Sequence, residues 1–178
     1  MKAKLFEVKE TKDKGKGLFA KEHIPKGTIT WFKCAKCKTY TKSSIENLKG
    51  KEKEFVYWHA YKIKTGKYIL PCDEASYTNH SCNANILNSG KGFDIVVKDI
   101  RKGEEATYDY RTFYDIKMKC NCGENNCCKI VRSKYPIPID LNKYWRKKIK
   151  PSLKQVKRVH QPLKKYLIRS ENFSKIIE

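Results

Sequence analysis

Short apolar runs alternate with turn residues along the first two thirds of the chain. Residues 5–32 contain several such runs, separated by KGKG and by PKG, and this pattern favours strands over a helix. Residues 61–70 indicate a hairpin that turns at 65–66, and residues 90–110 indicate two further strands separated by a turn at 102–103. The pattern therefore predicts a mostly β body.

One helix is predicted inside this body. Ser43 and Glu46 have the spacing of a capping box, and the residues that follow carry apolar side chains among charges. Glycine weakens a helix interior. We therefore predict a short helix that is broken or weakened near Gly50.

The C-terminal part is predicted to be extended first and then helical. Pro136 and Pro138 do not fit a helix interior, so the chain around them should be extended. Asp140 and Ser152 are suitable N-caps for two short helices, the second ending before Pro162. A β body is thus followed by a cysteine-rich segment and a helical tail.

Composition limits the class of protein. The 178 residues are 39% hydrophobic and 12% aromatic, which is enough for one domain with a core. No apolar run approaches the ~20 residues of a membrane-spanning helix, and the N-terminus lacks the apolar segment of a signal peptide. We expect a soluble intracellular protein of the nucleus or cytoplasm, or of a nucleoid if prokaryotic; a viral protein acting in a host cell is an open alternative. In such compartments the eight cysteines indicate thiols or metal ligands, zinc first, rather than disulfides.

The net charge of +21 is concentrated toward the C-terminus. Residues 1–128 carry 25 Lys and Arg against 16 Asp and Glu, whereas residues 129–178 carry 15 against 3. Such a tail attracts polyanions, so contact with nucleic acid through this basic tail is one expectation. A solvated, lysine-rich surface without a partner is the alternative.

Four separated motifs stand out: GKGLFAKEHIPKGT at 15–28, NHSCNAN at 79–85, KGEEATYDY at 102–110 and CNCGENNC at 120–127. In this order they resemble the motifs of SET-domain protein-lysine methyltransferases that carry a post-SET zinc segment. The similarity spans roughly residues 5–131. Each motif alone is weak, but four in the right order are specific.

The resemblance implies a fold, a domain division and an activity. The fold is the SET-domain β-clip, mostly β with short helices and pseudo-knotted C-terminal motifs. The division is a SET domain over 1–115, a post-SET cysteine segment over 116–135 and a basic helical extension over 136–178. The activity is methyl transfer from S-adenosylmethionine to a lysine side chain of a protein, with a histone-like or chromatin-associated protein as the partner.

The resemblance assigns seven residues to S-adenosylmethionine: Lys16, Gly17, Leu18, Tyr77, Asn79, His80 and Ile130. Glycine next to Lys16 lets the backbone approach a ligand closely. An Asn amide both donates and accepts hydrogen bonds, which suits an ammonium and carboxylate edge. For GKG an ordinary hairpin turn is the alternative, and for His80 a structural hydrogen-bonded role is favoured over that of a general base.

Two positions depart from the family pattern. Ala84 replaces the usual Pro before Asn85, which is expected to brace the loop. Ser76 stands where the family commonly has Arg, three residues before the motif Asn. One cation near the cofactor is therefore missing, which should weaken cofactor binding rather than the fold.

The cysteines give the sharpest metal argument. Cys120, Cys122 and Cys127 offer three thiolates on a tight loop, and tetrahedral zinc needs a fourth ligand. The resemblance supplies it from Cys82, so that one Zn²⁺ would join the C-terminal loop to the cofactor motif. Cys128 is an adjacent thiol that could substitute.

A second C-x-x-C stands apart from these motifs. It consists of Cys34 and Cys37, and Cys72 is the one further cysteine that could join it. Free thiols are the favoured interpretation, and a second zinc site is the alternative.

TYDY supplies the expected catalytic tyrosines. By resemblance Tyr110 is the catalytic hydroxyl, and Tyr108 occupies a position where the family has Tyr or Phe. A Tyr there leaves less room for added methyl groups, so mainly monomethylation is predicted, with some dimethylation. Alternating aromatic packing on a strand is the alternative for both. Further aromatic lining is expected from Tyr57, Trp58 or Tyr61.

The charge leaves the substrate open, because a protein of +21 repels other cationic proteins. The favoured interpretation is a substrate bound to nucleic acid, with residues 140–178 contacting the phosphates of that nucleic acid. A local acidic patch from Glu104, Glu105 and Asp109, or an acidic or neutral substrate, are the alternatives. Two other function classes also stay open: a non-catalytic basic zinc protein that attaches to nucleic acid, and a degenerate SET scaffold.

Overall fold

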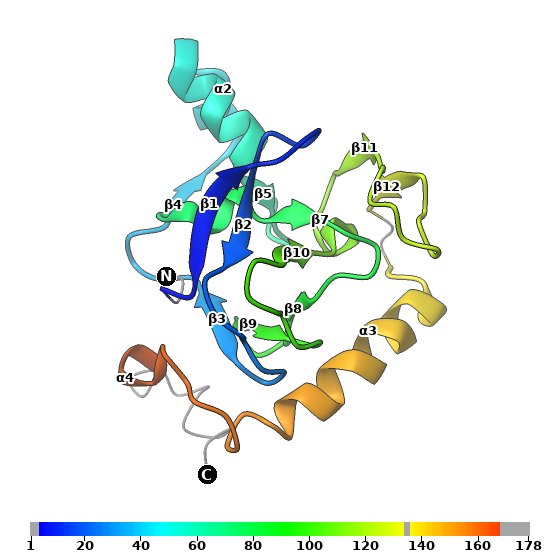
Figure 1. Ribbon diagram of the computed structural model, residues 1–178. Helices are drawn as coiled ribbons and strands as arrows, with labels where there is room; N and C mark the ends of the chain where they lie inside the picture. Colours follow the sequence, from blue (N-terminus) through cyan, green and yellow to red (C-terminus); the bar gives the residue numbers. More distant parts are fainter. Residues whose placement is uncertain (1–3, 134–135, 168–178) are drawn as a thin grey trace.

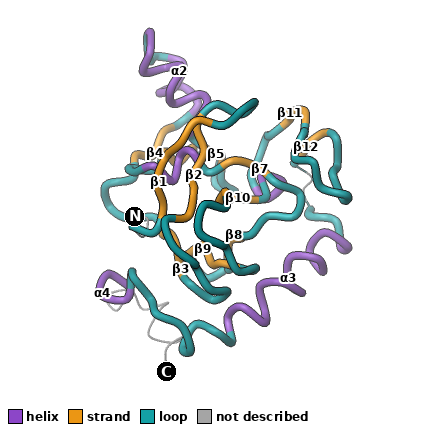
Figure 2. The backbone as a smooth tube through the Cα atoms, viewed as in Figure 1, coloured by secondary structure: helices purple, strands orange, loops and turns teal. Residues whose placement is uncertain are grey.

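In the residues that the computed structural model describes, 4–133 and 136–167, short strands predominate over helices (Figure 1, Figure 2). The main sheet contains β1 (Phe6–Glu10), β2 (Lys16–Ala20), β3 (Ile29–Phe32), β7 (Asn79–His80), β8 (Ile86–Asn88), β9 (Phe93–Val96) and β10 (Glu105–Tyr108). A three-stranded sheet contains β4 (Lys38–Tyr40), β5 (Tyr61–Lys62) and β6 (Tyr68–Leu70), and a hairpin contains β11 (Lys117–Lys119) and β12 (Ile130–Arg132). The predicted mostly β class is confirmed.

Strand β10 is where distant segments meet. The main sheet has the order β1-β2-β10-β8-β9-β3, and β7 also pairs with β10. Strand β2 runs antiparallel to β10 with Leu18 opposite Ala106, whereas β7 runs parallel to it with His80 opposite Tyr108. The GKG, NHSC and TYDY motifs therefore lie side by side in one sheet.

The predicted turns are in place. Strands β5 and β6 pair as an antiparallel hairpin, and Gly66 in its turn has a φ of 80°, a conformation that favours glycine. Gly103, with a φ of 79°, lies in the turn that leads into β10. Strands β9 and β10 are not neighbours in the sheet, because β8 lies between them.

The predicted break near Gly50 separates two helices, α1 (Lys42–Glu46) and α2 (Gly50–His59). The predicted capping box of Ser43 and Glu46 is wrong. The cap is Thr41, whose hydroxyl accepts from the backbone N–H of Ser44 at 3.1 Å, while the Ser44 hydroxyl accepts from the N–H of Thr41 at 2.8 Å. Thr41 has an extended backbone and lies two residues before Ser43, so the helix begins earlier than the sequence pattern indicated.

The C-terminal helices are α3 (Ile139–Leu153) and α4 (Lys164–Leu167). The predicted extended segment is confirmed at Pro138, which precedes α3 with a ψ of 138°, so that Asp140 lies in the first turn instead of capping it. The predicted cap at Ser152 is wrong, because Ser152 lies inside α3 and its hydroxyl donates to the carbonyl of Lys148 at 2.9 Å. Pro151 interrupts the hydrogen bonds only in the last turn of α3, so the helix continues past it.

The C-terminal segment shares its core with the main sheet. Trp145 of α3 and Leu163 and Leu167 beyond it are buried together with Leu87 and Ile95 of β8 and β9. Each such side chain contributes about 1.5–3 kcal/mol by leaving water, and α3 lies beside these strands (Figure 1). The predicted domain boundary at residue 136 stays a prediction, but the helical extension packs on the body.

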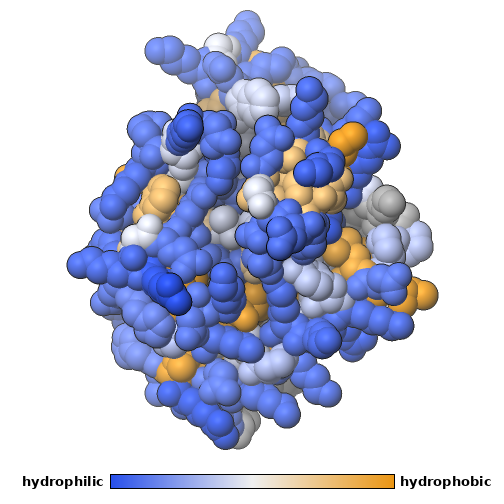
Figure 3. Space-filling model, turned by 45° about the vertical axis from the view of Figure 1, so that its right-hand side comes forward, coloured by the Kyte–Doolittle hydropathy of each residue, from blue (hydrophilic) through white to orange (hydrophobic). Residues whose placement is uncertain are grey.

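The surface is largely hydrophilic. In Figure 3 hydrophobic residues form small separate patches on the face shown. Among the described residues, no helix has the length and apolar character needed to cross a membrane.

Candidate active site

The segments that meet at β10 form part of the wall of an open cavity of about 1230 Å³. This exceeds the ~300–1,000 Å³ of ordinary ligand pockets, so it has room for more than one ligand. Its wall includes seven of the residues predicted for the cofactor or for catalysis: Lys16, Leu18, Tyr77, Asn79, His80, Tyr108 and Tyr110. The predicted cofactor and tyrosine residues therefore share one space.

Asn79 connects the three motifs. Its Nδ2 donates to the carbonyl of Lys16 at 3.1 Å and to Oε1 of Glu105 at 2.8 Å. The other carboxylate oxygen of Glu105 accepts from Nζ of Lys14 at 2.7 Å. With both contacts made by Nδ2, the carbonyl Oδ1 of Asn79 is left to accept from a donor in the cavity, such as an ammonium group.

The two glycines of GKG have different roles. Gly15 has a φ of 67° in the turn between β1 and β2, where its carbonyl accepts from the N–H of Thr11 at 2.6 Å. A Cβ on Gly17 would lie 2.8 Å from Oε1 of Glu105 and 3.0 Å from Nδ2 of Asn79. The hairpin interpretation is thus correct for Gly15, whereas Gly17 makes room for the polar side chains of the site.

The two tyrosines of TYDY are anchored at their hydroxyls. The Tyr110 hydroxyl donates to the carbonyl of Thr78 at 2.6 Å, and the Tyr108 hydroxyl lies 3.5 Å from Oδ1 of Asp94. Burial, with Glu105 adding to it, raises the pKa of Tyr110; burial and Asp94 raise the pKa of Tyr108. Both hydroxyls are therefore protonated at neutral pH and act as donors rather than bases.

An aromatic stack surrounds these hydroxyls. Phe113 stacks on Tyr108 with ring centroids 5.3 Å apart and on Tyr61 with centroids 4.7 Å apart. All three residues considered for further lining do line the cavity. Tyr61 belongs to this stack, whereas Tyr57 and Trp58 are 70% and 72% exposed. Phe113 carries no sequence signal, because an aromatic residue after a strand usually only packs.

Asp94 on β9 is a site residue that the sequence did not reveal. It lines the cavity, and Nδ2 of Asn88 donates to its Oδ1 at 3.0 Å. Burial raises the pKa of Asp94 to about 7. A carboxyl group with such a pKa, beside an aromatic cavity, can exchange a proton at neutral pH.

Asp109, between the two tyrosines, holds a buried network. Its side chain is 1% exposed and accepts from Nε of Arg111 at 2.8 Å and from Nη2 of Arg111 at 2.5 Å. The indole N–H of Trp145, on α3, donates to the same carboxylate at 2.8 Å. Asp109 therefore cannot belong to a surface acidic patch with Glu104 and Glu105, and the predicted patch is wrong for this residue.

Replacing Trp145 by Phe should destabilise the protein. The change removes a hydrogen bond to a buried carboxylate, worth about 1.5–3 kcal/mol, and leaves a gap in the core. Urea unfolding should show this loss. Lys143→Ala, at an exposed position of α3, is the control and should change stability by less than about 0.5 kcal/mol. Equal stability of the two variants would remove Trp145 from the network.

His80 is held in one tautomer. Its Nδ1 accepts from the backbone N–H of Tyr110 at 3.0 Å, and burial lowers its pKa despite the opposing effect of Asp109. The ring is therefore neutral with its proton on Nε2, which lies 3.4 Å from Sγ of Cys82. This geometry agrees with the favoured structural role, in which His80 donates to the sulfur.

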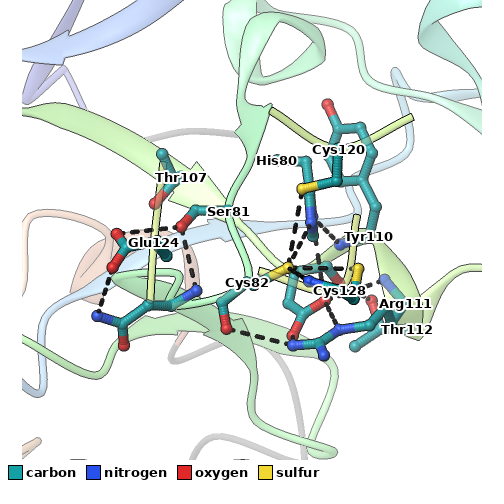
Figure 4. A network of polar contacts seen from close by, with 12 residues as sticks. His80, Ser81, Cys82, Thr107, Tyr110, Arg111, Thr112, Cys120, Glu124 and Cys128 are labelled. Carbon is teal, nitrogen blue, oxygen red and sulfur yellow. Dashed lines mark hydrogen bonds and ion pairs between the residues drawn. The ribbon is translucent and has the colours of Figure 1, made fainter. Parts of the chain in front are cut away.

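Two overlapping ligand sets surround Cys82. The sulfurs of Cys82, Cys120, Cys122 and Cys127 lie within 4.8 Å of one another, and so do the ligand atoms of His80, Cys82, Cys120 and Cys128. Figure 4 shows Cys82 between His80, Cys120 and Cys128. Because the free lone pair of neutral His80 is already used by Tyr110, its Nε2 cannot also bind a metal ion. The four-thiolate set fits Zn²⁺ better, and the N–H of Cys128, 3.3 Å from Sγ of Cys82, supports that sulfur from outside the set.

Polar contacts tie the cysteine loop to the rest of the site (Figure 4). Glu124 accepts from the Ser81 hydroxyl at 3.5 Å and from Nδ2 of Asn83 at 3.2 Å. The side-chain Oδ1 of Asn83 accepts from Nζ of Lys148, on α3, at 2.6 Å. The NHSC segment thus contacts both the cysteine loop and the C-terminal helix.

The remaining predicted positions lie as follows. Asn85 braces β10, since its Nδ2 donates to the carbonyl of Glu105 at 2.9 Å and its Oδ1 accepts from the N–H of Thr107 at 2.8 Å. Ile130 is 45% exposed and lies outside the cavity wall, whereas its neighbour Val131 is fully buried against the cysteines. A cofactor contact by Ile130 stays a prediction.

Comparison with known proteins gives a consistent family. The family model described as "SET domain" matches residues 15–111. Histone-lysine N-methyltransferase 2D of Homo sapiens is 30% identical over 134 residues, which cover 65% of the chain and 2% of that protein. The variant-silencing SET domain-containing protein of Plasmodium falciparum is 27% identical over 140 residues, which cover 68% of the chain and 5% of that protein. The chain therefore spans only a small part of the length of these relatives.

Solved structures show the same fold. The methyltransferase domain of human histone-lysine N-methyltransferase SETMAR matches with a TM-score of 0.53 and 20% identity, covering 72% of the chain and 58% of that domain. KRYPTONITE in complex with mCHG DNA and SAH matches with a TM-score of 0.51 and 18% identity, covering 71% of the chain and 29% of that protein. These likenesses confirm the predicted fold class.

Proposed function

Because the chain belongs to the SET-domain family, we propose that it transfers a methyl group from S-adenosylmethionine to a lysine side chain of a protein. The observation that carries the proposal is the shared cavity, whose wall contains the GKG strand, Asn79 and Tyr110. A basic zinc protein that only attaches to nucleic acid would have no use for this convergence. The histone-lysine methyltransferases among its relatives favour a histone-like substrate and hence a nuclear setting.

The cavity suits both reactants. The side-chain Oδ1 of Asn79 and the backbone beside Lys16 would hold the ammonium and carboxylate end of the methyl donor. The aromatic wall would hold the substrate lysine. The donor supplies an electrophilic methyl group on a sulfonium. Alignment of the amine with that methyl is the main task of the protein.

Deprotonation of the lysine is the chemical obstacle. Its ordinary pKa is about 10.4, so roughly one molecule in a thousand is neutral at pH 7. The aromatic wall formed by the buried Tyr108 and the half-buried Phe113 and Tyr61 disfavours the ammonium by desolvation. Asp94, with its pKa raised to about 7 beside Tyr108, is suited to receive the proton.

The direct test is incubation of the full chain with methyl-labelled cofactor and a panel of basic proteins, followed by mass mapping of the product. The panel should include histones free and bound to DNA, because exposed Lys and Arg side chains cover the outer face of α3, at Lys143, Arg146, Lys147 and Lys150. Preference for the DNA-bound form that disappears at high salt would support a phosphate contact. Binding of the cofactor without any transfer would favour the degenerate scaffold instead.

Tyr108→Phe should raise the number of methyl groups on the product. The Tyr108 hydroxyl lies at the cavity wall beside Asp94, and its removal frees space next to the acceptor amine. We expect mainly monomethyl-lysine from the native protein and a larger share of dimethyl- and trimethyl-lysine from the variant, measured by mass spectrometry. Dominant trimethylation by the native protein would contradict the prediction.

A further inference from the structure

Three cysteines outside the active site form a compact sulfur cluster. Cys34 and Cys37 lie between β3 and β4, and Cys72 follows β6. Their Sγ atoms are 3.5 Å apart for Cys34 and Cys72, 3.8 Å for Cys37 and Cys72, and 3.9 Å for Cys34 and Cys37. Free thiols were the favoured interpretation from the sequence, with a second zinc site as the alternative, and the three sulfurs do converge.

Strand pairing brings the three together. Strand β4 runs antiparallel to β6 with Lys38 opposite Leu70, which places the residue before Lys38 near the chain that leaves β6. Cys37 is buried, Cys34 is half-buried and Cys72 is exposed. The cluster therefore sits at the protein surface with one side open to solvent.

The sulfur spacing is that of a metal site. Zn–S bonds of about 2.3 Å in a tetrahedron place the sulfurs about 3.8 Å apart, which matches all three distances. A disulfide would need a separation of about 2.05 Å. Thiolates are soft ligands that favour Zn²⁺ over Mg²⁺ or Ca²⁺.

We propose that Cys34, Cys37 and Cys72 bind a second zinc ion, distinct from the one expected at Cys82. Within residues 4–133 and 136–167, no fourth His, Cys, Asp or Glu joins these three. The fourth position therefore faces solvent and takes a water molecule. Zinc sites with three protein ligands hold a water molecule in the fourth position.

The ion would fasten the segment that enters the active site. Directly after Cys72, Asp73 caps the short 3-10 helix η1 (Glu74–Tyr77) by accepting from the N–H of Ala75 at 3.1 Å. Ser76 and Tyr77 of η1 line the cavity, and Asn79 follows. A helix of four residues has little stability of its own. Metal binding itself is independent of the proposed function; only this positioning role rests on it.

Zinc content provides the test. We expect the full chain, purified under reducing conditions with zinc as the only added metal, to hold two zinc ions by elemental analysis. Cys34→Ser and Cys72→Ser should each hold one, whereas Cys128→Ser, outside this cluster and outside the four-thiolate set at Cys82, should keep two. One zinc in the native chain, or two in Cys72→Ser, would overturn the proposal. The metal count does not depend on methyl transfer, so failure of either proposal is recognised separately.

Alkylation of the native chain tests the site without a variant. Cys72 is exposed, so as a free thiol it is accessible to iodoacetamide. We expect its modification, mapped by mass spectrometry, to be at least about tenfold slower in the zinc-loaded protein than after chelation, because a metal-bound thiolate is shielded. Equal rates before and after chelation would contradict a zinc site at Cys72.

Discussion

Tyr110→Phe is expected to lower turnover at least about a hundredfold, the usual contribution of one positioned catalytic side chain, while the protein stays folded. The hydroxyl is fixed by the carbonyl of Thr78 at 2.6 Å and faces the cavity that Asn79 also lines. Its removal costs one hydrogen bond, about 0.5–1.5 kcal/mol of stability. The measurement is initial-rate methyl transfer with the cofactor at saturation, beside a thermal melt.

The control for Tyr110 is Tyr166→Phe. Tyr166 is 42% exposed on α4, away from the cavity wall, so its hydroxyl should have no effect on turnover. Cofactor affinity, measured by calorimetry, should change little in either variant, because the proposed role of Tyr110 is toward the methyl and amine rather than the rest of the donor. Native turnover in Tyr110→Phe would remove this residue from the mechanism.

Cys82→Ser is expected to give the largest loss of stability. Cys82 is fully buried, lies at the centre of the thiolate cluster and belongs to the NHSC segment. Loss of a structural metal ligand is among the few changes that cost more than about 4 kcal/mol. We expect one zinc fewer per chain, a much lower melting temperature and weak cofactor binding, because His80 and Asn79 lose the support of the metal.

Cys128→Ser separates the two ligand sets around Cys82. If zinc is held by Cys82, Cys120, Cys122 and Cys127, this variant keeps its zinc and most of its stability. If zinc is held by His80 and Cys128 instead, it loses the ion while Cys122→Ser does not. The second outcome would require a different tautomer of His80, and with it a broken hydrogen bond from Tyr110.

Short motifs in the sequence are enough to predict the family of this protein. Residue type and short-range order are enough to recognise GKG, NHSC, TYDY and the cysteine loop, and turn residues such as Gly66 mark strand ends, because these features depend on a few neighbouring residues. The predicted fold class and most strands followed from them. Cap positions such as Thr41 and the end of α3 were misjudged, because several polar residues near each helix end compete for the same role.

Which side chains contact one another depends on the tertiary fold. Strand β10 brings Asn79, Gly17 and Glu105 close together, although Asn79 and Glu105 are 26 residues apart in the sequence. Asp94 and Trp145 entered the site through sheet order and helix packing, which no local pattern encodes. The same holds for Cys72, which approaches Cys34 only because β4 pairs with β6. Contacts between distant segments depend on the burial of the whole core, and local sequence carries little information about them.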